Sequence, residues 1–473
     1  VVGNWGHITV TQNAAVYGND GATVGDDLGT DPGTTYTVDS FAREVITQGT
    51  AYLNSIGFTA STWGNFDGNG DGYIDYLFIV HAGQGQEDGG GVLSNGAALG
   101  ANALTSRIHT FSGGLPAMGG GKSVQRCAIV PEDVTVGELA WYMAKMMGAP
   151  ETRNTNSRYP TDASGNNESS AAFWDLMADG YLLGNKIGTS PANMNAYQRI
   201  QQGWVSPVTY SVSDQPRNVT LGRIEGNNPY PKALRINLPD YSPNQPHSGS
   251  YYWWSRMDTG EWHQLQRTLS VTTLPATLEY WAWHDTESGY DTCEVQVSYS
   301  GGPYSTVESY SGQSNGWVQH TIALGATGDV DVRFVYTTDG DKTGVGWFLD
   351  DFTLTQGGSV TWADDVEAGA TGWVVTSSGL NQWTRTTPPT FHHYYLAEWR
   401  SHYGFDSGYN QSVSYLTNPA AGTSVWYSYN PGLLVWYVNE RWAPGENYAG
   451  FRPGEGFLLP IDAHPTPVLN GAT

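Results

Sequence analysis

Cysteine is nearly absent from this 473-residue sequence, which has only Cys127 and Cys293, far apart along the chain. A disulfide framework of the kind that holds small secreted domains together is therefore excluded. One bond between the two is an alternative, but we expect two buried free thiols, because an unpaired cysteine packs as a small apolar side chain. Long apolar runs are absent as well, and no stretch approaches the roughly 20 residues that span a bilayer. We therefore expect no membrane span.

Basic residues are also scarce, with 21 Lys and Arg against 45 Asp and Glu, so the formal net charge is −24. Such a charge repels nucleic acids and anionic membrane surfaces, and it suits calcium binding and a secreted, extracellular or cell-surface location. In contrast, 29 Tyr and 19 Trp supply large apolar surfaces and exclude a disordered chain. The sequence opens inside a segment typical of a strand (HITVTQ), so we expect a mature or partial chain.

Helical patterns occur only in the first part of the sequence. Apolar residues recur at helical spacing over 40–56 and 135–147, while 76–81 (YLFIVH) is a continuous apolar run typical of a buried strand. These elements predict an α/β domain over residues 1–207.

The rest of the sequence alternates apolar and polar residues in short segments separated by Gly, Ser and Asp turns. The pattern is clearest over 249–358, for which we predict a jelly-roll β-sandwich. Residues 229–240 (PYPKALRINLPD) are typical of the opening strands of a domain that resumes after the sandwich. We therefore expect 208–248 and 359–473 to form one β-rich C-terminal domain with the sandwich inserted in it, an α+β multidomain fold.

Five segments carry a family resemblance: 66–91 (FDGNGDGYIDYLFIVHAGQGQEDGGG), 136–151 (VGELAWYMAKMMGAPE), 171–184 (AAFWDLMADGYLLG), 393–406 (HYYLAEWRSHYGFD) and parts of 429–465 (YNPGLLVWYVNERW, RPGEGFLLPIDAHP). Together they resemble the secreted zinc metallopeptidases of the immune inhibitor A type (peptidase M6-like). The resemblance implies that the first three are an acidic loop with a buried strand, the zinc helix, and the segment that closes the active-site cleft. The last two resemble the family's C-terminal domain.

The sequence departs from the family where the zinc is held. The family's helix carries H-E-x-x-H followed by Gly-x-Pro-Asp; anchored on 148–151 (GAPE), the two histidine positions hold Trp141 and Lys145, and the glutamate position holds Tyr142. Indole and ammonium nitrogens offer zinc no lone pair. A tyrosine phenol, whose ordinary pKa is about 10, cannot replace the carboxylate base at neutral pH. We therefore predict a pseudopeptidase with no catalytic residues at this helix, and zinc is not expected.

Some residues could in principle restore a metal site, and these are Glu138, Glu151, His81 and His109. Zinc demands a defined set of donors in tetrahedral geometry, so isolated His and Glu residues more often have structural roles. Trp141 and Lys145 lie one helical turn apart, where an aromatic ring and a lysine stem can pack together. An active extracellular metallopeptidase with an atypical metal site stays as the alternative.

An acidic loop matches the first nine positions of an EF-hand-like calcium loop. Its expected ligands are Asp67, Asn69, Asp71, Tyr73 and Asp75. Gly72 provides the sharp turn, but Phe78 stands where the twelfth-position glutamate would be, so Glu87 or Asp88 would have to complete the site. The alternative is an Asx-rich turn without metal.

A second set of acidic residues lies in the predicted sandwich. Glu287, Asp291, Asp350 and Asp351 resemble the cluster that holds a structural calcium ion in jelly-roll modules of this family. The alternative is a solvated acidic edge. In either loop calcium would stabilise the fold and take no part in catalysis.

The function expected from these residues is a structural, assembly or binding role in a catalytically inactive protein stabilised by calcium. Its partner would be another protein or a second copy of the chain, and a self-assembling filament or surface-layer component is a further alternative, since strand edges can join subunits. The aromatic cluster at 251–254 with Trp281 and Trp283 is a candidate glycan-binding face, although aromatics at alternating strand positions more often fill a core.

Overall fold

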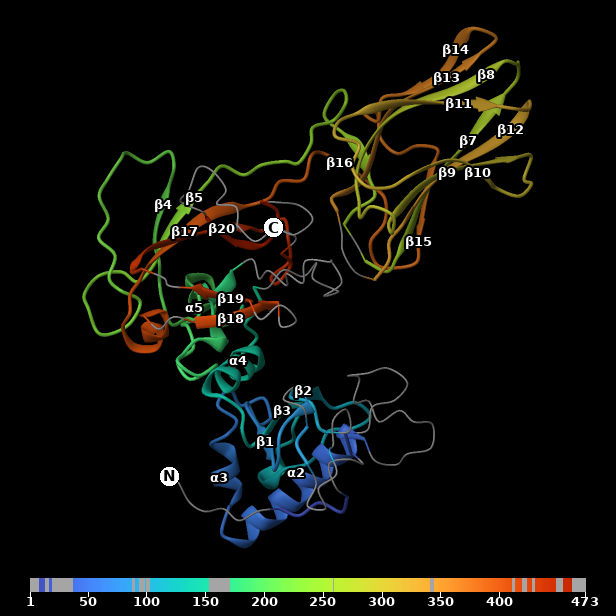
Figure 1. Cartoon of the computed structure of the whole chain (residues 1–473). Helices are drawn as coiled ribbons and strands as arrows, with labels where there is room; N and C mark the ends of the chain where they lie inside the picture. Colours follow the sequence, from blue (N-terminus) through green and yellow to red (C-terminus); the bar gives the residue numbers. More distant parts are fainter. Residues whose placement is uncertain are drawn as a thin grey trace. The chain divides into compact units, whose positions relative to one another are not determined.

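The computed structural model describes residues 8–12, 17–18, 37–86, 90–92, 98, 103–152, 171–257, 259–340, 344–410, 413–418, 423–427, 430–447 and 454–461. The chain divides into two compact units (Figure 1): Val1–Pro239 with His393–Thr473 form the first, and Asp240–His392 form the second. The second unit is therefore inserted in the sequence of the first. Within the described residues, no helix has both the length and the apolar character to cross a membrane.

The N-terminal part of the first unit combines helices with a three-stranded sheet. Its elements are α2 (Val38–Ser55), α3 (Ala60–Gly64), β1 (Phe78–His81), β2 (Arg107–Thr110), η3 (Gly119–Gly121), β3 (Arg126–Pro131) and α4 (Val136–Met146). The strand order is β1-β3-β2, with β1 parallel and β2 antiparallel to β3. Phe41 of α2, Trp63 of α3 and Ile79 of β1 belong to one buried cluster, so the helices cover the sheet through this core.

Both α2 and α4 begin with a capping box. At α4, the Thr135 hydroxyl accepts a hydrogen bond from the backbone N–H of Glu138, and the Glu138 carboxylate accepts one from the N–H of Thr135. The helices predicted over 40–56 and 135–147 are thus confirmed, with ends that differ by one or two residues. The predicted strand within 76–81 is present as β1.

The remaining part of the first unit is a five-stranded sheet with short helices. Its elements are η4 (Ala172–Trp174), η5 (Gly180–Leu182), α5 (Ala196–Gln201), β4 (Val208–Ser211), β5 (Leu234–Asn237), β17 (His393–Arg400), η6 (Gly404–Asn410), β20 (Gly432–Asn439) and β21 (Leu458–Pro460), beside a two-stranded sheet of β18 (Val413–Asn418) and β19 (Thr423–Tyr427). The order is β21-β20-β17-β5-β4. Because β5 pairs with β17, the chain leaves this sheet before residue 240 and returns beside the same strand at residue 393.

The second unit is a β-sandwich. Its strands are β6 (Tyr252–Trp254), β7 (Trp262–Val271), β8 (Ala276–Asp285), β9 (Thr292–Tyr299), β10 (Ser305–Tyr310), β11 (Val318–Leu324), β12 (Gly328–Thr337), β13 (Gly346–Gln356), β14 (Ser359–Asp364), β15 (Trp373–Ser377) and β16 (Thr384–Thr386). One sheet has the order β10-β9-β12-β7-β15, and the other has the order β11-β8-β13-β6-β16 with β14 paired to β13. Leu265 and Phe334 of the first sheet share one buried cluster with Tyr280 and Trp347 of the second, so the two sheets pack face to face.

The sandwich extends beyond the predicted boundaries of 249–358. Gly357 and Gly358, at the predicted end of the sandwich, form the two-residue turn between β13 and β14, and both have a positive φ (55° and 81°) that glycine readily adopts. Strands β15 and β16 then pair with β7 and β6. The predicted boundary at residue 358 therefore falls inside a hairpin, because a Gly-Gly pair is typical of both linkers and tight turns.

Packing accounts for the cysteines and for part of the aromatic cluster. Cys127 and Cys293 are free and buried, as the sequence predicts. Tyr252, Trp253 and Trp254 are 0%, 3% and 7% exposed. Trp253 lies in the core between the two sheets, whereas Tyr252 and Trp254 belong to a separate buried cluster with Val345 and Phe348. These three members of the candidate glycan-binding face are therefore buried.

Candidate functional site

The face of α4 that bears Trp141 and Lys145 lies against the segment that contains η5. Gly137 approaches the backbone of Tyr181 so closely that a Cβ atom at this position would overlap the Tyr181 carbonyl oxygen. This approach places the Tyr181 ring beside Trp141, with ring centroids 5.9 Å apart. A small residue at position 137 thus lets η5 cover the helix face that would carry the zinc ligands in the family.

Residues at two other motif positions contact the Lys145 side chain. Its ammonium nitrogen lies 4.3 Å from the centroid of the Trp141 ring, a cation–π contact. The same nitrogen forms an ion pair with the carboxylate of Glu151, which stands at the aspartate position of Gly-x-Pro-Asp. The side chains of Lys145 and Glu151 are 31% and 33% exposed. The positions that would converge on a metal ion therefore contact one another.

Tyr142, at the position of the catalytic base, packs into the interior. It is 8% exposed and belongs to a buried cluster with Ala128 and Val130 of β3 and Met146 of α4. A phenol in these surroundings cannot take the part of a carboxylate that activates water.

The alternative metal ligands have separate partners: Glu138 with Thr135, Glu151 with Lys145, His109 with Asp39, and His81 with the carbonyl oxygen of Ala82. Among the described residues, one group of three acidic side chains is close enough together to hold a metal ion, and it lies in the second unit. No group of three His, Cys, Asp or Glu side chains at that spacing lies on α4 within the described part of the chain. The described residues around α4 therefore offer Zn²⁺ no set of donor atoms that fits it.

The acidic loop before β1 is folded around Asp67. Its Oδ1 accepts hydrogen bonds from the backbone N–H groups of Gly70 and Asp71 at 2.8 and 3.0 Å, and its Oδ2 accepts one from Gly72 at 3.0 Å. The ammonium group of Lys122, which follows η3, lies 2.5 Å from the same Oδ2. Lys122 holds the pKa of Asp67 below its usual range. A fixed cation thus occupies one side of the predicted calcium ligand.

The other predicted ligands of this loop bond mainly within the loop. Asp71 accepts hydrogen bonds from the side chain of Asn69 and from the N–H of Tyr73, at 3.0 and 2.9 Å. Asp75 accepts one from the N–H of Gly68 at 2.8 Å. Glu87 and Asp88, the candidates to complete the site, lie outside the described residues. The calcium loop stays a prediction.

Glu287 and Asp291 meet a third carboxylate that the sequence did not identify, that of Asp339 in the turn after β12. Ligand oxygens of the three residues lie within 4.8 Å of one another. Asp291 is fully buried and accepts hydrogen bonds from the N–H groups of Glu287 and Asp339 at 3.1 and 3.3 Å. Burial raises the pKa of Asp291 to about 6, and the neighbouring charges of Glu287 and Asp339 add to this shift.

Asp350 and Asp351 lie apart from this group and hold the segment that enters the sandwich. Asp350 accepts hydrogen bonds from the N–H groups of His247 and Ser248 at 2.9 and 3.2 Å, and burial raises its pKa to about 7. Asp351 contacts the imidazole of His247 at 2.5 Å and accepts a hydrogen bond from the Ser248 hydroxyl at 2.7 Å. The predicted group of four is therefore two separate pairs, and Asp339 takes the place expected for the second pair.

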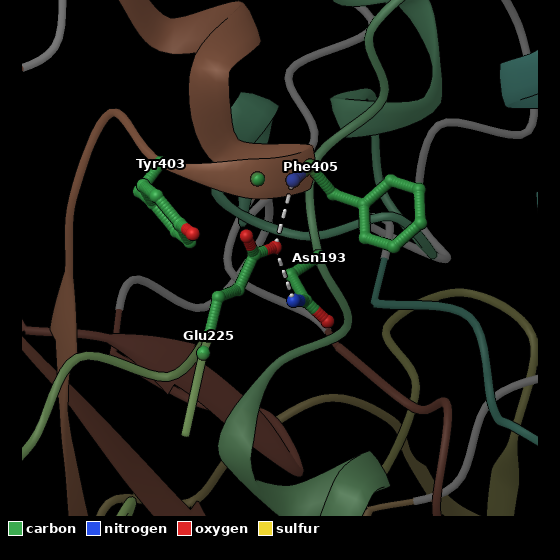
Figure 2. Close-up of a pocket in the computed structure, with 6 residues that line it drawn as sticks. Asn193, Glu225, Tyr403 and Phe405 are labelled. Atoms are coloured by element: carbon green, nitrogen blue, oxygen red, sulfur yellow. Dashed lines mark hydrogen bonds between the residues drawn. The ribbon is translucent and has the colours of Figure 1, made fainter. Parts of the chain in front are cut away.

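A pocket of about 500 Å³ opens in the first unit (Figure 2); its lining consists of Asn193, Glu225, Gly226, Tyr403, Gly404 and Phe405. Oε1 of Glu225 accepts hydrogen bonds from the Asn193 side chain at 2.8 Å and from the Phe405 N–H at 2.9 Å. Burial, reinforced by the charge of Asp406, raises the pKa of Glu225. Sequence reasoning missed this pocket because its three segments are far apart in the chain.

Family models match both ends of the chain. The model of the immune inhibitor A peptidase M6 catalytic domain matches residues 1–205, and that of the immune inhibitor A-like metallopeptidase VEG domain matches residues 389–472. The stretch between them contains β4, β5 and all but the last few residues of the second unit.

Two curated proteins match almost the whole chain. The pre-pro-metalloprotease PrtV of Vibrio cholerae serotype O1 is 28% identical over 495 residues, which cover 97% of this chain and 50% of that protein. Immune inhibitor A of Bacillus thuringiensis subsp. alesti is 29% identical over 513 residues, which cover 98% of this chain and 69% of that protein. The chain thus spans half the length of the first of these relatives.

Among solved structures, the chain is similar to TmCBM61, described in complex with beta-1,4-galactotriose. The two are 20% identical, and the match covers 23% of this chain and 73% of that chain, with a TM-score of 0.18. At this TM-score the likeness carries no argument about the fold or ligand of this protein.

Proposed function

Because the chain belongs to the immune inhibitor A-type family of M6 peptidases, we propose that it is a secreted member that has lost zinc-dependent catalysis. Its proposed role is structural, in assembly or in binding, with calcium as a stabilising ion. The whole-protein activity, the partners and the location are all part of this proposal.

One observation carries the proposal: the contact of Lys145 with both Trp141 and Glu151. An ammonium group at a ligand position repels Zn²⁺ and has no lone pair to give while protonated. Its ion pair also occupies the carboxylate of Glu151, the one carboxylate among these motif positions. A zinc ion would have to displace this pair and still find further ligands.

We expect the purified protein to leave casein intact, with or without added zinc, because α4 supplies neither the metal ligands nor the base. Glu151→Gln serves as the matched control, since any weak cleavage by an atypical site built on Glu151 would disappear in this variant, whereas a contaminant would persist. Cleavage by the wild type that a chelator stops, that zinc restores and that Glu151→Gln lacks would overturn the proposal.

For calcium, the carboxylates of Glu287, Asp291 and Asp339 are the proposed site in the sandwich. Oxygen ligands suit this ion, and a cation there would balance the buried charge of Asp291. The predicted loop of Asp67 to Asp75 is the second proposed site. In both places the ion would hold together turns and strands, and neither site touches α4.

Calcium should stabilise the sandwich only when Asp291 is ionised. Its pKa of about 6 is above that of an unfolded aspartate, so without calcium this group stabilises the fold at low pH, and this contribution is lost as the pH rises through about 6. The stabilisation by calcium has the opposite pH dependence, so it should grow as the pH rises above about 6. Thermal melts at about pH 5 and about pH 8, with and without calcium, measure both trends. The Asp291→Asn variant should lose the increment while Asp350→Asn keeps it; equal calcium increments at both pH values would count against this site.

Lys122→Met should strengthen calcium binding at the first loop, by about tenfold (about 1.4 kcal/mol). The ammonium lies 2.5 Å from Asp67 and competes for its carboxylate, whereas methionine keeps a similar apolar stem without charge. Calorimetric titration in the Asp291→Asn background isolates this loop from the sandwich site. Unchanged affinity would mean that Asp67 is no calcium ligand.

Self-assembly is the second proposed function. Strands β4 and β10 lie at the edges of their sheets within the described residues, and several side chains of β10 are exposed. Such edges can pair with strands of another copy. Light scattering at rising protein concentration, with and without calcium, distinguishes this function. Growth in particle size supports assembly, whereas a particle size that stays that of a monomer supports the binding role instead.

A further inference from the structure

The pocket around Glu225 brings together parts of the chain that the two family models separate. Asn193 precedes α5, Glu225 and Gly226 lie between β4 and β5, and 403–405 follow β17. All of these residues belong to the first unit. Neither the degenerate motif on α4 nor the proposed calcium sites use any of them.

The polar groups of the pocket are arranged so that acceptor capacity remains. The side-chain N–H of Asn193 and the backbone N–H of Phe405 both donate to Oε1 of Glu225 (Figure 2). These two donors are therefore already used. The other carboxylate oxygen lies next to Gly404, and a Cβ atom at Gly404 would overlap it. A ligand that matches this pocket brings hydrogen-bond donors.

The charge of Glu225 has no direct ion-pair partner among the described residues. Asp406, its acidic neighbour, is bound by the Arg400 guanidinium at 2.8 and 2.9 Å. The Lys232 ammonium interacts with Glu225 electrostatically but donates its hydrogen bonds to the backbone carbonyl oxygens of Arg223 and Gly226. Burial and the charge of Asp406 raise the pKa of Glu225, so the more distant charge of Lys232 does not offset them. An incoming positive charge would relieve this cost.

Aromatic rings complete the pocket. Tyr403 and Phe405 are 50% and 65% exposed, and they stand on opposite sides of the Glu225 carboxylate (Figure 2). The Tyr403 ring already holds a cation, because the Arg223 guanidinium carbon lies 3.9 Å from its centroid. Exposed aromatic surface beside a carboxylate suits an apolar stem that ends in a cation.

We propose that this pocket binds the side chain of a lysine from a partner protein, with the ammonium group on the Glu225 carboxylate and the stem against Tyr403. An ammonium has three donors and no acceptor, which matches a pocket whose own donors are occupied. A carboxylate would need the donors that Glu225 already uses, whereas a sugar hydroxyl can donate to Glu225 but brings no charge to balance it. This inference rests on the binding role proposed above and makes it more specific. Its test measures the binding of an ammonium group at Glu225, so the inference can fail while the binding role stands.

The test compares three small probes: Nα-acetyl-lysine methylamide, its Nε-acetylated form, and the norleucine analogue, which has the stem without the charge. Amide NMR signals of Gly226 and Gly404 report binding. The lysine probe should bind at least about tenfold more tightly than either neutral probe. Glu225→Gln should reduce lysine binding to the level of norleucine, whereas Glu440→Gln, which removes an exposed charge outside the pocket, should leave it unchanged.

Three results would overturn the inference: equal binding of the lysine and Nε-acetylated probes, no saturable shift of the two glycine signals with the lysine probe, or full lysine affinity in Glu225→Gln. The comparison of probes on the wild-type protein needs no variant, so it decides the question even where Glu225→Gln folds poorly. Tyr403→Ala adds a second variant, in which the affinity for the lysine probe should fall because the stem loses its contact.

Discussion

Replacing Glu398 with alanine should lower the free energy of unfolding of the first unit by about 3–5 kcal/mol. Glu398 lies on β17, is 0% exposed, and forms ion pairs with Arg199 of α5 and Arg400 of β17. Its Oε1 also accepts a hydrogen bond from the Trp436 indole at 2.9 Å. Burial alone would raise the pKa of Glu398, but the charges of Arg400 and Arg199 outweigh it and hold the pKa below its usual range.

The loss is large because alanine would leave a buried arginine, Arg199, without its carboxylate. Arg400 would keep Asp406, which it contacts at 2.8 and 2.9 Å. Arg199 lies in the stretch matched by the peptidase-domain model and Glu398 in that matched by the VEG-domain model, so this network joins the two. Unfolding by denaturant measures the change, with Glu440→Ala, an exposed glutamate, expected to stay within about 0.5 kcal/mol. A Glu398→Ala loss no larger than that of the control would refute the network's role.

Replacing Trp347 with alanine should destabilise the sandwich by about 3–5 kcal/mol. Trp347 on β13 is fully buried, and its ring centroid lies 5.6 Å from that of Trp383 and 5.7 Å from that of Phe334. Alanine would leave a cavity between the two sheets that these rings cannot fill. Trp262→Ala is the matched control, since Trp262 is 42% exposed and should cost much less.

Denaturant unfolding measures the loss of stability in Trp347→Ala. Comparing it with Trp262→Ala separates the cost of the core cavity from the cost of losing a surface ring. Equal destabilisation by the two changes would contradict the packing described for the sandwich core. The Glu398 and Trp347 variants act in different units, so their effects should add when combined.

Local patterns predicted the elements of this fold well. The spacing of apolar residues over 135–147 is readable within one segment, which is why the predicted helix agrees with α4 to within one residue at each end. The alternating strands of the sandwich were predictable for the same reason. The boundary at Gly358 was not, because whether a Gly-Gly pair is a turn or a linker depends on the pairing of β14 with β13.

The sites depended more on tertiary contacts. The motif alignment identifies Trp141 and Lys145 from the sequence, but the ion pair between Lys145 and Glu151 is visible only in the structure. Lys122 reaches Asp67 from 55 residues away. Asp339, after β12, meets Asp291, before β9, at the end of these two paired strands. No sequence spacing predicts such meetings, since each is set by how strands and turns pack.

The proposed loss of zinc is tested most directly by elemental analysis of the purified wild-type protein and of Glu151→Gln after dialysis against zinc and calcium. The geometry of α4 predicts no stoichiometric zinc in either protein, since Lys145 occupies Glu151 and no cluster of donors lies on the described face of the helix. The two proposed calcium sites lie elsewhere and predict calcium in both proteins. Stoichiometric zinc in the wild type that is absent from Glu151→Gln would contradict the account and place a metal centre at α4.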